Sequence, residues 1–138
     1  MSAFVLLDTG PWVATIDSGD SKNKACVNFI KQFKGQFLTT YPALTEALYL
    51  LNSDLRSQQA CFEWIRCGAV RLVQIERDML ERTEVLMTKY ADIPMDFADA
   101  TLVALAEKSG INQIFSLDRK GFTTFKINGK KSFVLFPG

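Results

Sequence analysis

Short apolar segments that alternate with helix-like segments constrain the fold of this chain most strongly. Residues 3–7, AFVLL, form a continuous apolar run, which is typical of a strand buried on both faces. Three further strand-like segments follow at 36–40, 69–75 and 112–117, and segments with helical periodicity separate them. This alternation predicts an α/β fold, a three-layer α/β/α sandwich with a mostly parallel central sheet.

The helical segments and the tail complete this prediction. Asn128-Gly129 lies between two β-prone segments, a hairpin-like signal, and residues 132–136 form a final strand-like run. No repeat, linker or low-complexity segment interrupts the chain, so we expect a single domain over residues 1–138. The predicted helices span residues 21–34, 41–51, 54–67, 76–90 and 96–109.

Composition excludes several kinds of chemistry. The chain has no histidine, which excludes a Ser-His-Asp triad, a Cys-His pair and histidine-containing zinc sites. Its three cysteines are odd in number and form no C-x-x-C motif, so neither a disulfide framework nor a thiol-redox motif is indicated. The first apolar run is broken by Asp8, and no apolar stretch is long enough to span a bilayer. We expect a cytoplasmic protein without membrane contact.

Acidic residues recur where the predicted strands give way to helices. In a parallel sheet these junctions share one edge, where ligands bind, so carboxylates far apart in sequence should converge there. Such a cluster repels itself unless a proton or cation compensates it. With only oxygen ligands available, the expected cation is magnesium or manganese. The residues concerned are Asp8, Glu46, Asp99 and Asp118, with Asp96 one helical turn before Asp99.

Each acid also has an ordinary structural explanation. Asp8 can stabilise a turn through its own backbone, Asp96 is a natural helix N-cap, and Asp118 suits a turn before Arg119. Glu46 differs, because its helix is apolar nearly all round and a charge there needs a compensating partner. The constellation is more specific than any single member.

These segments resemble the PIN-domain family, and the VapC-type toxins in particular, over essentially the whole chain. In relatives a further acid often follows the fourth one, whereas here Gly121 stands before Phe122, which bears on how many metal ions are held. The matching segments are LLDTGPWVA with Asp8, TTYPALTEALYLL with Glu46, MDFADATLVALAEKSG with Asp99 and accessory Asp96, and IFSLDRKGF with Ser116 and Asp118.

The resemblance implies a Mg²⁺-dependent (or Mn²⁺-dependent) endoribonuclease, the toxin of a toxin–antitoxin pair, acting as a homodimer and silenced by a small antitoxin. Chemistry agrees, because without histidine a carboxylate-bound metal must activate water. A PIN-like module that binds RNA or a protein without cutting is the alternative. A phosphotransfer protein is a third reading, but only one acid follows the first strand.

Substrate contacts are less specific. Thr9 and Ser116 can hydrogen-bond a ligand carboxylate or a phosphate, or serve as ordinary turn residues. Arg119 and Lys120 adjoin the expected site and can neutralise RNA phosphates, or simply face solvent. Trp12 can stack on a base or lie in the core or a dimer interface. Further lysines cluster in the tail at Lys126, Lys130 and Lys131.

Two helical segments carry more apolar residues than a small sheet needs. Phe62 and Trp64 lie in the segment 54–67. Leu80 and Met87 lie in the segment 76–90, where periodicity places them on the inner side together with Met79 and Leu86. This excess supports the homodimer.

Overall fold

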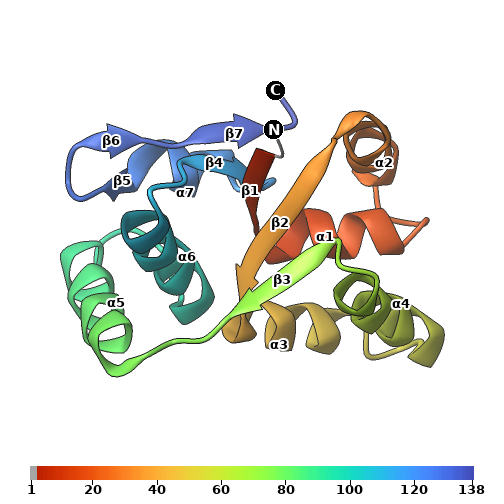
Figure 1. Cartoon of the computed structure of the whole chain (residues 1–138), viewed down its shortest axis with the longest axis horizontal. Helices are drawn as coiled ribbons and strands as arrows, with labels where there is room; N and C mark the ends of the chain where they lie inside the picture. The colour runs from red at the N-terminus through yellow and green to blue at the C-terminus, as the bar shows by residue number, and fades with distance from the viewer. Residues whose placement is uncertain (1–2) are drawn as a thin grey trace.

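A single five-stranded sheet with helices on both faces organises the chain (Figure 1), in a computed structural model that describes residues 3–138. The strand order is β3-β2-β1-β4-β7, and every neighbouring pair is parallel. The predicted α/β/α sandwich is therefore confirmed. The strands of this sheet are β1 (Ala3–Leu7), β2 (Gly35–Thr40), β3 (Val70–Val73), β4 (Gln113–Phe115) and β7 (Val134–Phe136).

Seven helices in the described residues connect or flank these strands. Among them no helix is both long and apolar enough to cross a membrane. The helices are α1 (Thr9–Ile16), α2 (Asn23–Gln32), α3 (Tyr41–Leu50), α4 (Leu55–Arg66), α5 (Arg77–Lys89), α6 (Phe97–Ser109) and α7 (Arg119–Thr124).

The sheet separates two apolar cores. Successive side chains of a strand point to opposite faces, so Val5 and Leu7 of β1 enter one core and Leu6 enters the other. The first core is closed by α1 to α4, and the second by α5, α6 and α7 (Figure 1). This is why the first strand reads as a continuous apolar run rather than an alternating one.

Helix α6 begins at the carboxyl edge of the sheet. It begins at the N-cap Asp96 and ends at Gly110, which adopts φ 77° as a left-handed C-cap. The side chains from Ala98 to Ala106 are buried except Asp99. The Thr101 hydroxyl lies 2.8 Å from the Thr40 hydroxyl at the end of β2. This contact ties the first turns of α6 to the carboxyl end of the sheet.

Several local expectations change in the structure. Thr40 occupies the N-cap of α3, but its side chain bonds Thr101 instead of the helix backbone. Helix α7 was not expected. Leu80 and Met87 were predicted to face inward but are 49% and 37% exposed. The buried side of α5 consists of Met79, Thr83 and Leu86 and does not include them. Trp12 is fully buried in the first core, so it is unavailable for base stacking.

The predicted hairpin forms from β5 (Lys126–Ile127) and β6 (Lys131–Ser132), which pair antiparallel. Asn128 and Gly129 have φ values of 54° and 72°, as a tight primed turn requires. The Asn128 N–H donates to Glu107 Oε2 of α6 at 2.9 Å. Arg82 of α5 donates to both carboxylate oxygens of Glu107, at 2.7 and 2.9 Å. One carboxylate thus joins α5, α6 and the hairpin.

We predict that Glu107→Ala destabilises the fold by about 1–3 kcal/mol, because it leaves Arg82 and the Asn128 N–H without their partner. Hydrogen–deuterium exchange should accelerate across residues 126–132. Glu81→Ala, at an exposed position on α5, is the matched control. Unchanged exchange in the hairpin of Glu107→Ala would show that Glu107 does not anchor it.

Candidate active site

Asp8 is the most deeply buried acid of the predicted constellation, with 7% of its surface exposed. It follows β1 and caps α1, accepting the Thr9 N–H at 2.8 Å through Oδ1. Its other oxygen accepts the Ser116 hydroxyl at 2.7 Å. Burial, and to a smaller extent the charges of Asp118 and Asp96, raise the pKa of Asp8 to about 6, although both hydrogen bonds oppose the shift.

Ser116 connects the ends of two adjacent strands. It lies directly after β4 and is buried. While its hydroxyl donates to Asp8, its oxygen accepts the Asp118 N–H at 3.0 Å. The position of Asp8 is therefore coupled to the backbone that presents Asp118. This places Ser116 against an acidic side chain, one of the roles expected from the sequence.

The start of α6 contributes two acids that cap each other's backbone. Asp96 Oδ1 accepts the Asp99 N–H at 2.8 Å, and Asp99 Oδ2 accepts the Asp96 N–H at 3.3 Å. The predicted N-cap role of Asp96 is confirmed. Burial and then the charges of Asp8 and Asp96 raise the pKa of Asp99 to about 8. A half-buried carboxyl group thus faces two other acids.

Glu46 and Asp118 approach the same place from different elements. Burial, followed by repulsion from Asp96 and Asp8, raises the pKa of Glu46 on α3. Asp118 caps α7 by accepting the Gly121 N–H at 2.9 Å, and its charge acts on both Asp8 and Asp99. The five acids therefore lie close enough at the carboxyl end of the sheet for their charges to act on one another.

The other candidate residues, Thr9, Arg119 and Lys120, differ in their surroundings. The Thr9 hydroxyl donates to the Ala43 carbonyl at 3.1 Å, so it braces α1 against α3 rather than facing the acids. Arg119 and Lys120 are exposed on the first turn of α7, immediately after Asp118. Arg119 Nη1 donates to the Pro137 carbonyl at 3.4 Å, and both side chains are accessible to a ligand at this edge.

The acids suit a hard cation by their chemistry but do not form a closed cage. All the donors are oxygens and their charges raise one another's pKa, which a divalent cation would relieve. Within residues 3–138, however, no three Asp, Glu, Cys or His side chains lie close enough together to hold a metal ion. Asp99 and Asp118 instead use their oxygens as helix caps. Each cap uses only one oxygen of the carboxylate, Oδ2 of Asp99 and Oδ1 of Asp118, so the other oxygen can still approach a cation.

Gly121 explains the missing acid of the last segment. A Cβ atom at this position would clash with the Asp118 carboxylate and press on the Phe125 ring. A side chain at position 121 is thus incompatible with Asp118 in its present capping position. Glycine here and the capped Asp118 belong together.

Sequence reasoning missed a hollow of about 600 Å³ beside the acids. Glu46 and Asp96 line it together with Tyr41, Tyr49 and Phe97, whose side chains are 47%, 70% and 42% exposed. The sequence of α3 indicated this exposed side. Tyr41 and Tyr49 are eight residues apart, so they lie on nearly the same side of the helix, and Leu44 and Ala47 occupy the other side.

The fold has known counterparts. The family model of the PIN domain matches residues 5–127, most of the chain. The chain belongs to the PIN-domain family. This match confirms the resemblance to the PIN-domain family that the sequence motifs indicated.

Proteins similar to this PIN domain include a named ribonuclease and a structure described as a toxin. Ribonuclease VapC26 of Mycobacterium tuberculosis is 24% identical over 135 residues, covering 96% of this chain and 100% of that protein. The crystal structure of M. tuberculosis VapC20, described as a sarcin-ricin loop cleaving toxin, superposes with a TM-score of 0.75 at 24% identity, covering 86% of this chain and 94% of that one.

Two complexes share the fold at lower identity. A toxin–antitoxin complex from Klebsiella pneumoniae has a TM-score of 0.66 at 16% identity and covers 88% of this chain and 92% of that one. VapBC2 from Rickettsia felis, bound to a promoter DNA fragment, has a TM-score of 0.63 at 12% identity, covering 96% and 97%. At these identities, all three likenesses to solved structures concern the fold alone.

We predict that the metal-free protein loses stability as pH rises from 5 to 8. Asp8 and Asp99 bind protons more tightly in the folded protein than in the unfolded chain, where the pKa is 3.8. Their contribution is complete below about pH 4 and disappears as pH rises through about 6 to 8. No histidine titrates in this window. Asp8→Asn should therefore raise the unfolding free energy at pH 8 by about 1–3 kcal/mol.

Thermal unfolding at several pH values checks this prediction. Asp99→Asn should likewise flatten the decline in melting temperature, whereas Asp92→Asn, at an exposed position between α5 and α6, should leave it unchanged. A wild-type protein whose stability is constant or rises between pH 5 and 8 would contradict the mutual repulsion of the acids.

Proposed function

We propose that this PIN domain is a metal-dependent endoribonuclease and the toxin of a toxin–antitoxin pair, acting in the cytoplasm. The observation that carries the proposal is the uncompensated acidic cluster. Among residues 3–138, none of Asp8, Glu46, Asp96, Asp99 and Asp118 forms an ion pair. Burying like charges together without a cation costs stability, and such an arrangement is characteristic of functional sites. The names of the relatives support ribonuclease activity.

The proposed cation is Mg²⁺ or Mn²⁺, held by Asp8, Glu46, Asp99 and Asp118 with Asp96 as an accessory. When bound, such an ion lowers the pKa of water and stabilises negative charge on the phosphate oxygens. Because Mg²⁺ keeps several of its waters and is usually bound directly by one or two carboxylates, the remaining acids would hold it through those waters.

The chain's own residues supply orientation and proton transfer. Ser116 holds Asp8 by a hydrogen bond, so the Asp8 carboxylate is preorganised before RNA arrives. A carboxylate of the cluster accepts the proton of the attacking water, directly or through a second water. Arg119 and Lys120 neutralise phosphates next to the cleaved bond.

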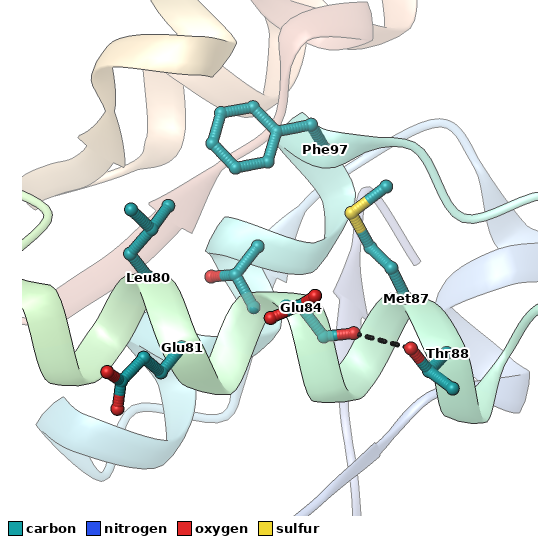
Figure 2. A pocket seen from close by; sticks show the side chains of 7 residues that line it. Leu80, Glu81, Glu84, Met87, Thr88 and Phe97 are labelled. Atoms are coloured by element: carbon teal, nitrogen blue, oxygen red, sulfur yellow. Dashed lines mark hydrogen bonds between the residues drawn. The ribbon is translucent and has the colours of Figure 1, made fainter.

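A second copy of the chain is the proposed partner for an exposed apolar surface on α3, α5 and the start of α6. Figure 2 shows its centre, where Phe97 of α6 faces Leu80 and Met87 of α5 across a hollow of about 510 Å³. Tyr41 and Tyr49 of α3, which line the adjoining hollow with Phe97, extend the surface, at 47% and 70% exposure. Exposed apolar side chains gathered on one surface are typical of an interface.

The other helix expected in the dimer lies elsewhere. Helix α4 covers the opposite face of the sheet from α5, and Trp64 is half-buried there against Trp12 and Phe37. On α4, Leu55 and Phe62 are exposed, at 67% and 42%, whereas on α5 Leu80 and Met87 line a hollow together with Phe97. The α5 surface is therefore the better candidate for the twofold contact. An antitoxin protein is the further proposed partner, supported by the toxin–antitoxin complexes among the solved relatives.

The second candidate function is a PIN-like module that binds RNA or protein without cutting. One observation favours it, namely that Asp118 and Gly121 together form a helix cap in place of a further acid. Metal binding without cleavage would distinguish this function from the first.

Cleavage should depend on the acids and on a divalent ion. Asp99→Asn, or excess EDTA, should lower the cleavage rate of a mixed RNA pool by at least about a thousandfold, because the cluster carboxylates would hold the ion that activates water and the chain has no histidine to replace it. Magnesium should also raise the melting temperature of the wild type, and raise that of Asp99→Asn less. Undiminished cleavage in EDTA would refute the metal site.

The oligomeric state tests the α5 surface. Leu80→Lys should weaken the dimer by at least about tenfold, roughly 1.4 kcal/mol, because it buries an unpaired charge. Phe62→Lys makes the same kind of change on α4 and should leave the dimer intact. Analytical ultracentrifugation of both variants measures this. A wild-type monomer at micromolar concentration, or dissociation caused by Phe62→Lys alone, would overturn the assignment.

A further inference from the structure

The charges of this chain are strongly segregated along the sequence. Residues 119–138 contain five of the sixteen basic residues and none of the fifteen acidic ones, so this segment carries +5 although the whole chain carries +1. The remainder of the chain is therefore net negative at −4. A local basic surface exists that the overall charge conceals.

The fold turns this segment into a continuous path that starts at the acidic site. Helix α7 begins directly after Asp118 and leads into the β5–β6 hairpin. The basic residues therefore follow one another from the acids outward. Arg119 and Lys120 lie on the first turn of α7, Lys126 lies on β5, and Lys130 and Lys131 lie at the turn and on β6.

A sixth basic residue joins this path from a distant part of the sequence. The Lys126 N–H donates to the Tyr90 hydroxyl at 3.0 Å, which packs the end of α5 against the hairpin. A Cβ atom on Gly129 would lie 3.4 Å from Lys89 Nζ, so the Lys89 ammonium group is beside the hairpin turn. Lys89, Lys130 and Lys131 are all exposed.

The cationic groups of these six residues are not neutralised by carboxylates. Among the described residues, none of the six basic residues forms an ion pair. Glu107 lies closest to the hairpin, but it is bound by Arg82 and by the Asn128 N–H, and only 9% of its side chain is exposed. Arg119 and Lys126 donate only to neutral oxygens, of Pro137, Thr123 and Ser132, so the surface keeps its positive charge.

The spacing indicates the kind of anion. Asp99 and Glu107 are eight residues apart on α6, which corresponds to about 12 Å along the helix. The hairpin is bonded to Glu107, so its lysines lie at the far end of α6 from the acids. A small phosphate cannot reach both places, whereas a chain of phosphates can follow the path between them.

We propose that Arg119, Lys120, Lys126, Lys130, Lys131 and Lys89 form a phosphate-binding track for the RNA segment that flanks the cleavage position. The inference rests on the proposed function, since it takes RNA as the ligand. Exposed ammonium groups act as point charges on phosphates, so the track contributes affinity without base specificity. It also makes substrate length a determinant of affinity.

Fluorescence anisotropy with labelled single-stranded RNA tests the track, in an Asp99→Asn background that prevents cleavage. The test variant is Lys126→Gln/Lys130→Gln/Lys131→Gln. The control is Lys24→Gln/Lys31→Gln/Lys34→Gln, which removes the same charge from exposed positions on and after α2, against the other face of the sheet. The test variant should bind a long RNA about tenfold or more weakly, and its salt slope should fall by about 2, as three lost phosphate contacts on a single strand require. The control should change neither.

Length and charge provide the remaining comparisons. A very short oligonucleotide that occupies only the acidic site should bind both variants equally, and replacing the three lysines by arginine should keep the affinity for long RNA. Equal losses in the test and control variants, or no loss for long RNA, would overturn the track. A loss confined to binding of poly-glutamate would overturn it in favour of an acidic protein partner. If the wild type fails to cleave RNA while the lysine effect on binding persists, the proposed nuclease function fails and the track stands.

Discussion

Repulsion among the carboxylates at the carboxyl end of the sheet is the constraint on which the rest of this structure depends. Burial and neighbouring charge raise the pKa of Asp8 to about 6 and push that of Asp99 further in the same direction. Each raised pKa means that the ionised carboxylate destabilises the folded state, and other interactions must offset this free energy. The acids arrive from β1, α3, α6 and α7, so the repulsion acts directly between the elements that build the site.

Several features hold these elements together against that repulsion. The two apolar cores clamp both faces of the sheet, and Leu6 and Leu7 of β1 are completely buried next to Asp8. The Ser116 hydroxyl bond to Asp8 and the Thr40–Thr101 bond fix the strand ends to which the acids are attached. A divalent cation would convert the same arrangement from a net cost into a binding site.

Much of this architecture was predictable because it depends on local patterns. Apolar runs buried on both faces predicted the parallel sheet, Asn128-Gly129 predicted the hairpin, and Asp96 was predicted as the N-cap of its helix; that Asp99 caps Asp96 in return emerged only from the structure. The positions of the acids at the strand ends followed from topology alone, since parallel strands share their carboxyl edge. Their roles in metal binding and catalysis stay predictions.

Features set by tertiary packing were not predictable. Helix α7 is only six residues long and contains a glycine, and it depends on the Asp118 cap and on burial of Phe122. The exposure of Leu80 and Met87 follows from how α5 lies on α6, which periodicity does not specify. The basic track likewise requires knowing that the end of α5 packs against the hairpin.

Carboxyl ¹³C NMR of the metal-free protein, repeated with saturating Mg²⁺, tests the central claim most directly. The account predicts that Asp8 titrates near pH 6 and Asp99 at a higher pH, and that Mg²⁺ moves both titrations below pH 5 with release of protons. Titration of both groups near pH 4 without metal, or curves that Mg²⁺ leaves unchanged, would contradict an acidic cluster built to bind a cation.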